Sequence, residues 1–595
     1  MIRTPLRPLP RILDARERGE NPDAIERENI RLRHEQLRDR ARRRAEGRLL
    51  VLTAMFLGAF LLIGGRMAVL AQSEPSEPRA SVAGAAITAA RADIVDRKGR
   101  LLATNFDTFS LYAQPPQMIE PARAARELAR IFPDLDADRL RRDFTGKRRF
   151  LWIKRQISPE QKQAVHDLGE PGLLFGPREM RLYPNGALAA HVLGGTRYGD
   201  EGVTAAEVIG VAGIEKALDA RLRDPARGHE PLRLSLDLSV QAALERVLAG
   251  GISMLDARGG AGILMDVRTG EIHAIASLPD FDPNARPAPP ASGRPSDSPL
   301  FNRAVQGVYE LGSVFKSFAV AQALEAGLVT PDGMIDTSGP LRWGKFAIRD
   351  FHDMGAELSV RDVLVRSSNI GAARIAQRIG ADRQREFLGA LGLLTPLEGV
   401  EMAESVHAKP LLPGKWSELS TMTIAYGHGL SVSPLHLAVA YAAIANGGRR
   451  VTPSLLTGGG APGARVLSAD VAATLRDMLR AVVADDEGTA RMARIAGYPI
   501  AGKTGTADKP APGGGYAEDS VIATFAGFFP AAAPRYVIVV MLDEPVDTSG
   551  DKPRRSAGWT AVPVAAEIVR RTAPLLGLRP QIEPLRLNDV RLTSQ

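Results

Sequence analysis

The sequence predicts an α+β protein in which a large mixed domain and a smaller mixed module are held outside a membrane by one N-terminal transmembrane helix. Three observations lead to this prediction. The run Leu49–Gly65 carries no charge, β-rich runs near 260–277 and 521–542 flank a helix-rich middle, and residues 80–233 mix strand-like and helix-like pieces without a repeat. A chain of 595 residues is also too long for one hydrophobic core.

The apolar run Leu49–Gly65 is the candidate membrane span. A helix over it rises about 26 Å, just short of a hydrocarbon core, and Met67–Ala71 completes the crossing once Arg66 snorkels to the far edge. A buried core helix is the alternative, and a cleaved signal peptide is disfavoured because 48 residues precede the run. We therefore expect an uncleaved anchor over 49–71 with the N-terminus cytoplasmic, since four arginines adjoin its start: Arg42, Arg43, Arg44 and Arg48.

Residues 1–48 form the predicted cytoplasmic tail. They hold 14 arginines against 9 acids and so supply most of the net charge of +8. Pro22–Ala45 is compatible with a charged helix, but we favour a solvated, partly disordered tail. No basic stripe interleaved with aromatics follows, so nucleic-acid binding is not expected. The chain has no cysteine, which excludes disulfides and thiolate nucleophiles.

Residues 72–232 form the predicted smaller module, which we expect to be non-catalytic. Ser110–Ala113 and Phe150–Lys154 are typical of short strands, whereas Ala122–Ile131 and Pro159–Leu168 are typical of amphipathic helices. The module is therefore expected to be α+β.

Residues 233–576 form the predicted large domain, and 577–595 a tail. Gly260–Met265 and Glu271–Ser277 predict a hairpin, and Val521–Phe529 and Tyr536–Leu542 predict two late strands before a helix over Val562–Leu576. Because strands occur at both ends of the domain, we expect one antiparallel sheet assembled from both ends, flanked by helices and by a helical subdomain.

Ser313 and Lys316 are the first candidate catalytic pair. Val314–Ala326 is compatible with a helix that ends at Gly327, which would place Ser313 at its N-terminus and Lys316 one turn on, facing the same side. A lysine kept neutral by burial can take the proton of a serine hydroxyl, and the Ser313 amide can face a developing oxyanion. Taken alone, the segment favours a capping serine and a surface lysine over a catalytic pair.

Two later segments complete the candidate site. Asp362–Ser368 predicts a helix closed by Ser367-Ser368-Asn369, whose hydroxyl and amide can face the nucleophile across a cleft. Lys503-Thr504-Gly505-Thr506 predicts a strand in which Lys503 and Thr504 bind a substrate carboxylate, Gly505 allows close approach, and Thr506 supplies a second oxyanion donor. Each segment alone also fits an ordinary polar helix end or strand.

Two other patterns in the chain are false leads. A second Ser-x-x-Lys, Ser549–Lys552, lies among prolines and glycines that prevent a rigid helix. The run Gly497–Thr504 matches the phosphate-binding pattern G-x-x-x-x-G-K-[ST], but the residues after it are too rich in glycine and proline for the helix that such a loop needs. We therefore reject a nucleotide site.

Ser-x-x-Lys, Ser-x-Asn and Lys-Thr-Gly, in this order, resemble the signature of penicillin-binding proteins and serine β-lactamases. Surrounding segments resemble class B penicillin-binding proteins over about residues 88–570, and the chain is most similar to the division-specific transpeptidases of that class. Ala557-Gly558-Trp559 departs from the glycine pair usual in relatives. Further segments that carry the resemblance are Arg91–Gly99, Arg181–Pro184, His191–Gly194, Gly210–Glu215, Tyr309-Glu310, Trp416-Ser417, Tyr426-Gly427 and Ala445–Gly447.

The resemblance implies the penicillin-binding transpeptidase fold on a dimerisation-type pedestal, and a reaction. Ser313 attacks the D-Ala-D-Ala end of a peptidoglycan stem peptide, and an amine of a neighbouring stem takes the acyl group. Lys316 is the base, Ser367 relays protons with Asn369 near Lys316, and β-lactams trap Ser313. Carried over in the same way, Lys503 and Thr504 hold the terminal carboxylate, Thr506 hydrogen-bonds to the substrate as well, and Gly505 lets the backbone approach closely, with no metal or organic cofactor.

The resemblance also implies a setting for the protein. The catalytic domain is expected in the periplasm, on stem peptides of a lipid-linked precursor or nascent glycan, with an FtsW-type glycosyltransferase and other division proteins as partners. Alternatives are an elongation-specific relative, a D,D-carboxypeptidase or β-lactamase, and a non-enzymatic β-lactam sensor or scaffold.

Overall fold

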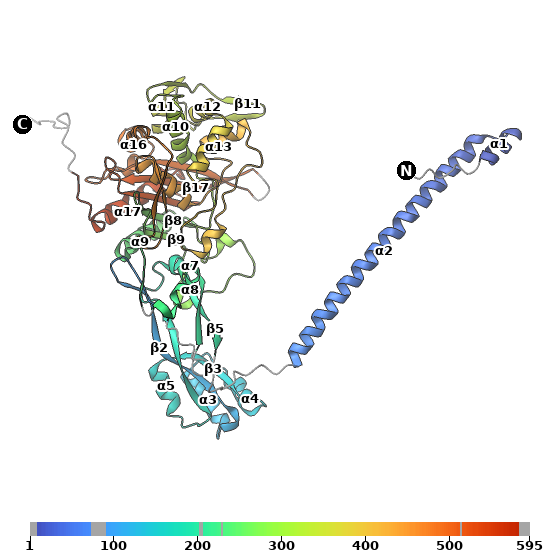
Figure 1. The fold of residues 1–595 in the computed structure, drawn as a ribbon, viewed down its shortest axis with the longest axis vertical. Helices are drawn as coiled ribbons and strands as arrows, with labels where there is room; N and C mark the ends of the chain where they lie inside the picture. The colour runs from blue at the N-terminus through green and yellow to red at the C-terminus, as the bar shows by residue number, and fades with distance from the viewer. Residues whose placement is uncertain (1–8, 73–90, 202–205, 228–229, 512–514, 582–595) are drawn as a thin grey trace, which may run out of the picture. The chain divides into compact units, whose positions relative to one another are not determined.

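The computed structural model describes residues 9–72, 91–201, 206–227, 230–511 and 515–581 (Figure 1). It divides into two compact units, Met1–Arg79 and Ala80–Gln595.

The first unit is helical. Helix α1 spans Leu9–Glu17 and helix α2 spans Pro22–Gln72. Within α2, Glu46–Met67 has a mean hydropathy of 2.0 with none of its apolar window buried, and is long enough to cross a membrane. The prediction of a partly disordered stretch over Pro22–Ala45 is wrong, because this segment is helical. Oppositely charged side chains one turn apart stabilise such a helix, as where Arg31 Nε lies 3.2 Å from Glu35 Oε1.

The module of the second unit is built on a five-stranded sheet of order β3-β2-β1-β7, with β4 paired to β2. Three amphipathic helices cover it, and a separate β5–β6 hairpin and short helices follow. The four predicted pieces all lie within or largely within these elements. The bounds are β1 Ile94–Val95, β2 Leu101–Ala113, α3 Pro121–Ile131, α4 Ala137–Thr145, β3 Leu151–Ile157, α5 Pro159–His166, β4 Leu173–Leu182, α6 Ala190–Leu193, β5 Gly195–Glu201, β6 Ala206–Ala212, α7 Gly213–Ala217, α8 Asp219–Leu222 and β7 Leu232–Arg233.

A buried ion cluster ties the module together from segments far apart in the sequence. Glu215, which is 0% exposed, accepts from Arg91 Nε at 2.5 Å and from Arg181 Nε at 2.7 Å. Tyr183 donates its hydroxyl to the same carboxylate at 3.3 Å, and Asp219 accepts from the other end of Arg91 at 2.7 Å. A buried carboxylate requires such pairing, since desolvation of an unpaired charge is costly.

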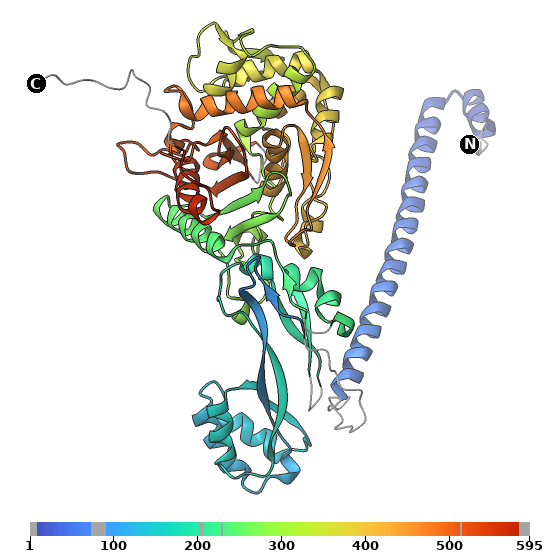
Figure 2. The ribbon, with the colours of Figure 1, turned by 60° about the vertical axis from the view of Figure 1, so that its left-hand side comes forward.

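The large domain contains the sheet that the sequence predicts, with strands from both ends of the domain. Its order is β16-β17-β18-β8-β9, all antiparallel, and the α+β fold class is therefore confirmed. Helices α9 and α17 pack on each other and on the sheet, and two further helices, α15 (Pro434–Ala445) and α16 (Ala469–Ala484), also contact its strands (Figure 2). The bounds are α9 Leu238–Met254, β8 Gly259–Asp266, β9 Ile272–Leu278, β16 Ala501–Pro510, β17 Tyr516–Phe529, β18 Tyr536–Asp543 and α17 Ala561–Leu575.

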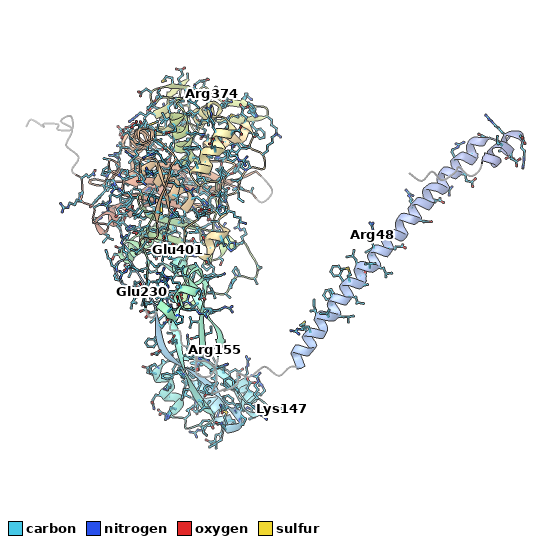
Figure 3. The ribbon with its side chains drawn as sticks, viewed as in Figure 1. Arg48, Lys147, Arg155, Glu230, Arg374 and Glu401 are labelled. Atoms are coloured by element: carbon cyan, nitrogen blue, oxygen red, sulfur yellow. The ribbon has the colours of Figure 1, made fainter. Side chains whose placement is uncertain are left out.

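The middle of the chain forms the helical part of this domain. It also contains two short hairpins, β11–β12 and β14–β15, and one pair of strands that are not consecutive in the chain, β10–β13. Figure 3 shows Arg374, on α12, at the end of the second unit away from Lys147 of the module. The bounds are α10 Lys316–Glu325, β10 Met334–Asp336, β11 Leu341–Trp343, β12 Phe346–Ile348, β13 Glu357–Ser359, α11 Val360–Val365, α12 Asn369–Ile379, α13 Ala381–Ala390, α14 Glu418–Ala425, α15 Pro434–Ala445, β14 Arg449–Thr452, β15 Ala461–Arg465 and α16 Ala469–Ala484.

Candidate active site

Ser313 and Lys316 lie together at the start of helix α10. Ser313 belongs to a 3-10 turn over Gly312–Phe315, and Lys316 is the first residue of α10 itself, so the helix begins later than predicted. Lys316 Nζ lies 2.9 Å from Ser313 Oγ. The lysine is 0% exposed, which contradicts the alternative of a surface side chain.

The Ser367–Asn369 segment meets Lys316 from the neighbouring helices. Lys316 Nζ lies 2.6 Å from the Ser367 carbonyl, 3.0 Å from Ser367 Oγ and 2.7 Å from Asn369 Oδ1. The predicted helix over Asp362–Ser368 is wrong at its end, because α11 ends at Val365. Ser367 adopts the left-handed conformation, with φ +67°, and this turns its hydroxyl and carbonyl toward the lysine.

Lys503 approaches the same hydroxyl from strand β16. Its Nζ lies 2.9 Å from Ser367 Oγ and donates to Thr504 Oγ1 at 3.3 Å. Thr504 Oγ1 in turn donates to Thr489 Oγ1 at 2.9 Å. Lys503 is also 0% exposed, so one half-buried hydroxyl, that of Ser367, bridges two buried amines.

Glycines bring the strand and the Ser313 turn into direct contact. A Cβ on Gly505 would lie 2.1 Å from the Leu311 carbonyl, and one on Gly312 would lie 2.6 Å from the Thr506 carbonyl. Gly312 also has φ +63°, which favours glycine. Thr506 Oγ1 accepts from the amide of Ala557 at 3.0 Å. Ala557, which stands where relatives usually have a glycine, therefore still contacts the strand.

Burial changes the protonation of both lysines. It lowers the pKa of Lys316 to about 7, against a smaller opposing effect of the negative charge of Asp350. Burial lowers the pKa of Lys503 well below its ordinary value, and the charge of Lys316 lowers it further. Near neutral pH a substantial fraction of Lys316 is therefore neutral and able to accept a proton from Ser313.

Neither of the two false leads forms the kind of site that its pattern suggests. Ser549 and Lys552 are both exposed. Residues 501–510 form strand β16, with Lys503 opposite Ala526 of β17, so no helix follows the Lys-Thr pair. Among the residues that the structure describes, no group of three or more His, Asp or Glu side chains is placed to hold a metal ion.

Asp350 is a site residue that the sequence reasoning missed. Its carboxylate accepts from Ser368 Oγ at 2.7 Å, from the amide of Ile370 at 3.1 Å and from the amide of Asn369. The preceding carbonyl, of Arg349, accepts from Asn369 Nδ2 at 3.0 Å and so orients the amide whose oxygen faces Lys316. The only signal in the sequence is an acid in the loop that also holds Asp353, 19 residues before Asn369.

Family models match most of the second unit. Residues 260–570 match the penicillin-binding protein transpeptidase domain, and residues 86–230 match the penicillin-binding protein dimerisation domain.

Individual relatives match over most of their length. The chain is 36% identical over 507 residues to the probable peptidoglycan D,D-transpeptidase FtsI of Caulobacter vibrioides, covering 84% of this chain and 83% of the relative. It is 32% identical to the probable peptidoglycan D,D-transpeptidase PenA of Neisseria gonorrhoeae, covering 86% and 88%. Penicillin-binding protein 3 from Mycobacterium tuberculosis, solved in complex with aztreonam, superposes with a TM-score of 0.62 at 28% identity, covering 83% of this chain and 97% of that one.

Proposed function

This chain belongs to the class B penicillin-binding proteins, and from that premise we propose that it crosslinks peptidoglycan at the division septum. It is a serine-type peptidoglycan D,D-transpeptidase. We also propose a septal role, a part for each site residue and a membrane topology.

Ser313 is the proposed nucleophile, and the observation that carries this is its pairing with a buried amine. Lys316 Nζ, 2.9 Å from Ser313 Oγ, takes the hydroxyl proton as the oxygen attacks the penultimate carbonyl of a D-Ala-D-Ala stem. The amides of Ser313 and Thr506 receive the developing oxyanion. The proton then passes to the departing D-Ala amine, and the acyl group stays on Ser313 as an ester.

Ser367 is proposed to carry protons between the two lysines, since its Oγ lies within 3.0 Å of both amines. Asn369 fixes Lys316 in reach of Ser313 through its Oδ1. Lys503 and Thr504 bind the terminal carboxylate of the stem, while Gly505 lets β16 lie close to the Ser313 turn. A β-lactam would follow the same acylation path and remain on Ser313, as expected for a relative of a protein solved with aztreonam.

The septal assignment is supported by the similarity to proteins named FtsI in Caulobacter vibrioides and Escherichia coli, at 36% and 29% identity. Other relatives bear the names PenA and PbpC, so an elongation role is the competing assignment. A fluorescent fusion separates the two: a septal enzyme gathers at mid-cell and its depletion gives filaments, whereas an elongation enzyme follows the side wall and its depletion gives round cells.

The proposed topology is a single pass, with the N-terminus in the cytoplasm and the catalytic domain in the periplasm. The span Glu46–Met67 supports the pass, and the arginines before it support the orientation. An FtsW-type glycosyltransferase and other division proteins are the partners that such a placement implies.

The reaction is tested by labelling the full-length protein with a fluorescent penicillin, followed by peptide mapping of the adduct. We expect the label on the peptide that contains Ser313 and its loss in Ser313→Ala. The matched control is Ser549→Ala, which alters the second Ser-x-x-Lys and should keep the label. Label on the Ser549 peptide, or retained label in Ser313→Ala, would overturn the assignment. A scaffold protein, in contrast, would support division with the Ser313→Ala substitution in place.

A further inference from the structure

A second group of titratable side chains lies beside the Ser313 turn, outside the contacts of Lys316 and Lys503. Its centre is His428, whose ring lies 5.3 Å from that of Tyr426 and 5.5 Å from that of Tyr516. Glu310 joins the group, because its carboxylate accepts from the Tyr516 hydroxyl at 3.0 Å and from the Gly429 amide at 2.7 Å. The group therefore combines segments of the chain near residues 310, 428 and 516.

Close backbone packing fixes this group next to the nucleophile. The Gly312 amide donates to the Gly427 carbonyl at 3.3 Å, and a Cβ on Gly427 would lie 2.0 Å from the Gly312 carbonyl. His428 follows Gly427, and Ser313 follows Gly312. Glu310 is three residues before Ser313. The imidazole and the carboxylate thus lie at the edge of the centre where an acyl-enzyme would form.

The electrostatic surroundings of His428 are mixed. Burial lowers its pKa below the ordinary value, and the charge of Lys316 lowers it further, whereas the negative charges of Glu310 and Asp508 oppose the change. Burial also raises the pKa of Tyr426 to about 12 and that of Tyr516 beyond its ordinary range, so both phenols stay protonated. His428 is therefore the only member of this group whose ordinary charge change falls near neutral pH.

One nitrogen of the imidazole is available for a new contact. Nδ1 of His428 is buried and has no hydrogen-bond partner among the described residues. Tyr516, which is 49% exposed, lies over the group. Its ring contacts that of His428 and its hydroxyl donates a hydrogen bond to the Glu310 carboxylate. Movement of this one exposed side chain would free both the carboxylate and the ring nitrogen.

We propose that Glu310 and His428 form the subsite for the acyl acceptor, a primary amine on the side chain of a second stem peptide. The inference rests on the proposed function, since it needs an acyl-enzyme on Ser313. A primary amine reaches the site as a cation, and the carboxylate of Glu310 attracts it. In this arrangement the ammonium takes the place of the Tyr516 hydroxyl on Glu310.

The amine must lose a proton before it can attack. His428 takes one proton from the ammonium, and the free nitrogen lone pair then forms the bond to the ester carbonyl. The bond from that carbonyl to Ser313 Oγ breaks, and its electron pair stays on Oγ. A second proton of the amine passes through Lys316 to Ser313 Oγ, which restores the hydroxyl, while the third remains on the new amide. His428 returns its proton to water.

The experiment separates acylation from transfer in the full-length protein in detergent. A thioester donor ending in D-alanine forms the acyl-enzyme, and a peptide with a free side-chain amine competes with water for it. The transfer-to-hydrolysis ratio is measured for His428→Gln and Glu310→Gln, and the rate of penicillin acylation is measured in parallel. The matched control is His407→Gln, an exposed histidine outside this group.

We expect His428→Gln to lose about tenfold or more in the ratio, beyond any loss in penicillin acylation, because general base catalysis is typically worth at least that much. In the wild type the ratio should fall on the acid side as His428 becomes protonated, and His428→Gln should lack this fall. Glu310→Gln should raise the amine concentration that gives half-maximal transfer, and Tyr516→Phe should lower it.

Three results would overturn the proposal. The first is an unchanged ratio in His428→Gln, and the second is an equal loss in both steps, which a purely structural role would produce. The third is a wild type that penicillin does not acylate at all. The last result would refute the proposed function as well, whereas the first two leave it standing.

Discussion

Lys316 and Lys503 meet at one hydroxyl, the Oγ of Ser367, which lies 3.0 Å from the first amine and 2.9 Å from the second. Two fully buried amines at this separation cannot both keep a positive charge without a large desolvation cost. At least one of the two amines is therefore neutral near pH 7, and a neutral lysine can act as a base.

The first prediction concerns the pH dependence of acylation. Because burial lowers the pKa of Lys316 to about 7, the neutral amine that we propose as the acceptor of the Ser313 proton is lost as the pH falls through this value. The second-order rate constant for acylation by a penicillin should therefore rise between about pH 5 and pH 8 and then level off. Circular dichroism over the same range would show that the protein stays folded. A flat profile would contradict Lys316 as the base.

The second prediction concerns Asp350, which we expect to hold the Ser367 turn. Asp350→Asn removes a charge and turns amide hydrogens toward the donors of Ser368, Asn369 and Ile370. The left-handed conformation of Ser367 costs about 1–3 kcal/mol, and without these hydrogen bonds the turn should relax out of it. Acylation should slow by about 10- to 100-fold.

The pH profile distinguishes this role from a general loss of structure. The negative charge of Asp350 raises the pKa of Lys316, so Asp350→Asn should move the inflection of the acylation profile to lower pH. Asp332→Asn, at an exposed acid, is the control and should match the wild type. A slower rate with an unmoved inflection would argue that Asp350 acts only on the fold.

The third prediction compares two glycines. Gly505→Ala would place a methyl group 2.1 Å from the Leu311 carbonyl, which forces β16 away from the Ser313 turn and should reduce acylation by at least about 100-fold. Gly250→Ala, in helix α9 with no atom within 4 Å, should keep full acylation and stabilise the fold by about 0.5–1 kcal/mol. Equal acylation by the two variants would contradict the close packing of strand and turn.

The fourth prediction concerns Glu215, the shared partner of Arg91 and Arg181. Glu215→Gln leaves the buried guanidinium of Arg181 without its counter-charge and that of Arg91 with Asp219 alone, and should destabilise the module by about 3–5 kcal/mol. Glu567→Gln breaks pairs with Arg570 and Arg571 that are more exposed and should cost less than about 1 kcal/mol. Thermal unfolding and protease susceptibility of the module would report the difference. A similarly small loss of stability in both variants would mean that water reaches the cluster and solvates its charges.

The sequence predicts those parts of the site that depend on local pattern. The Ser313 helix, the β16 strand and the sheet assembled from both ends follow from periodicity and from glycine and proline positions, and the family resemblance joins the three segments. The left-handed Ser367 could not be predicted, because the three residues that follow it are held by Asp350, which lies just after the β11–β12 hairpin and is distant in sequence. Local propensity also failed for Pro22–Ala45, where alternating charges stabilise a helix instead of disorder.

The pairing of β18 with β8 sets a condition on how the protein is made. Tyr536 pairs with Asp266 and Asp543 with Gly259, so the central strands of the catalytic sheet are separated by most of the domain. At usual rates of synthesis, roughly ten seconds to a minute pass between the appearance of the two strands. During that time the apolar edge of β8 has no partner and is open to aggregation. Any factor that shields this edge during synthesis would therefore control the yield of active enzyme, independently of the stability of the finished fold.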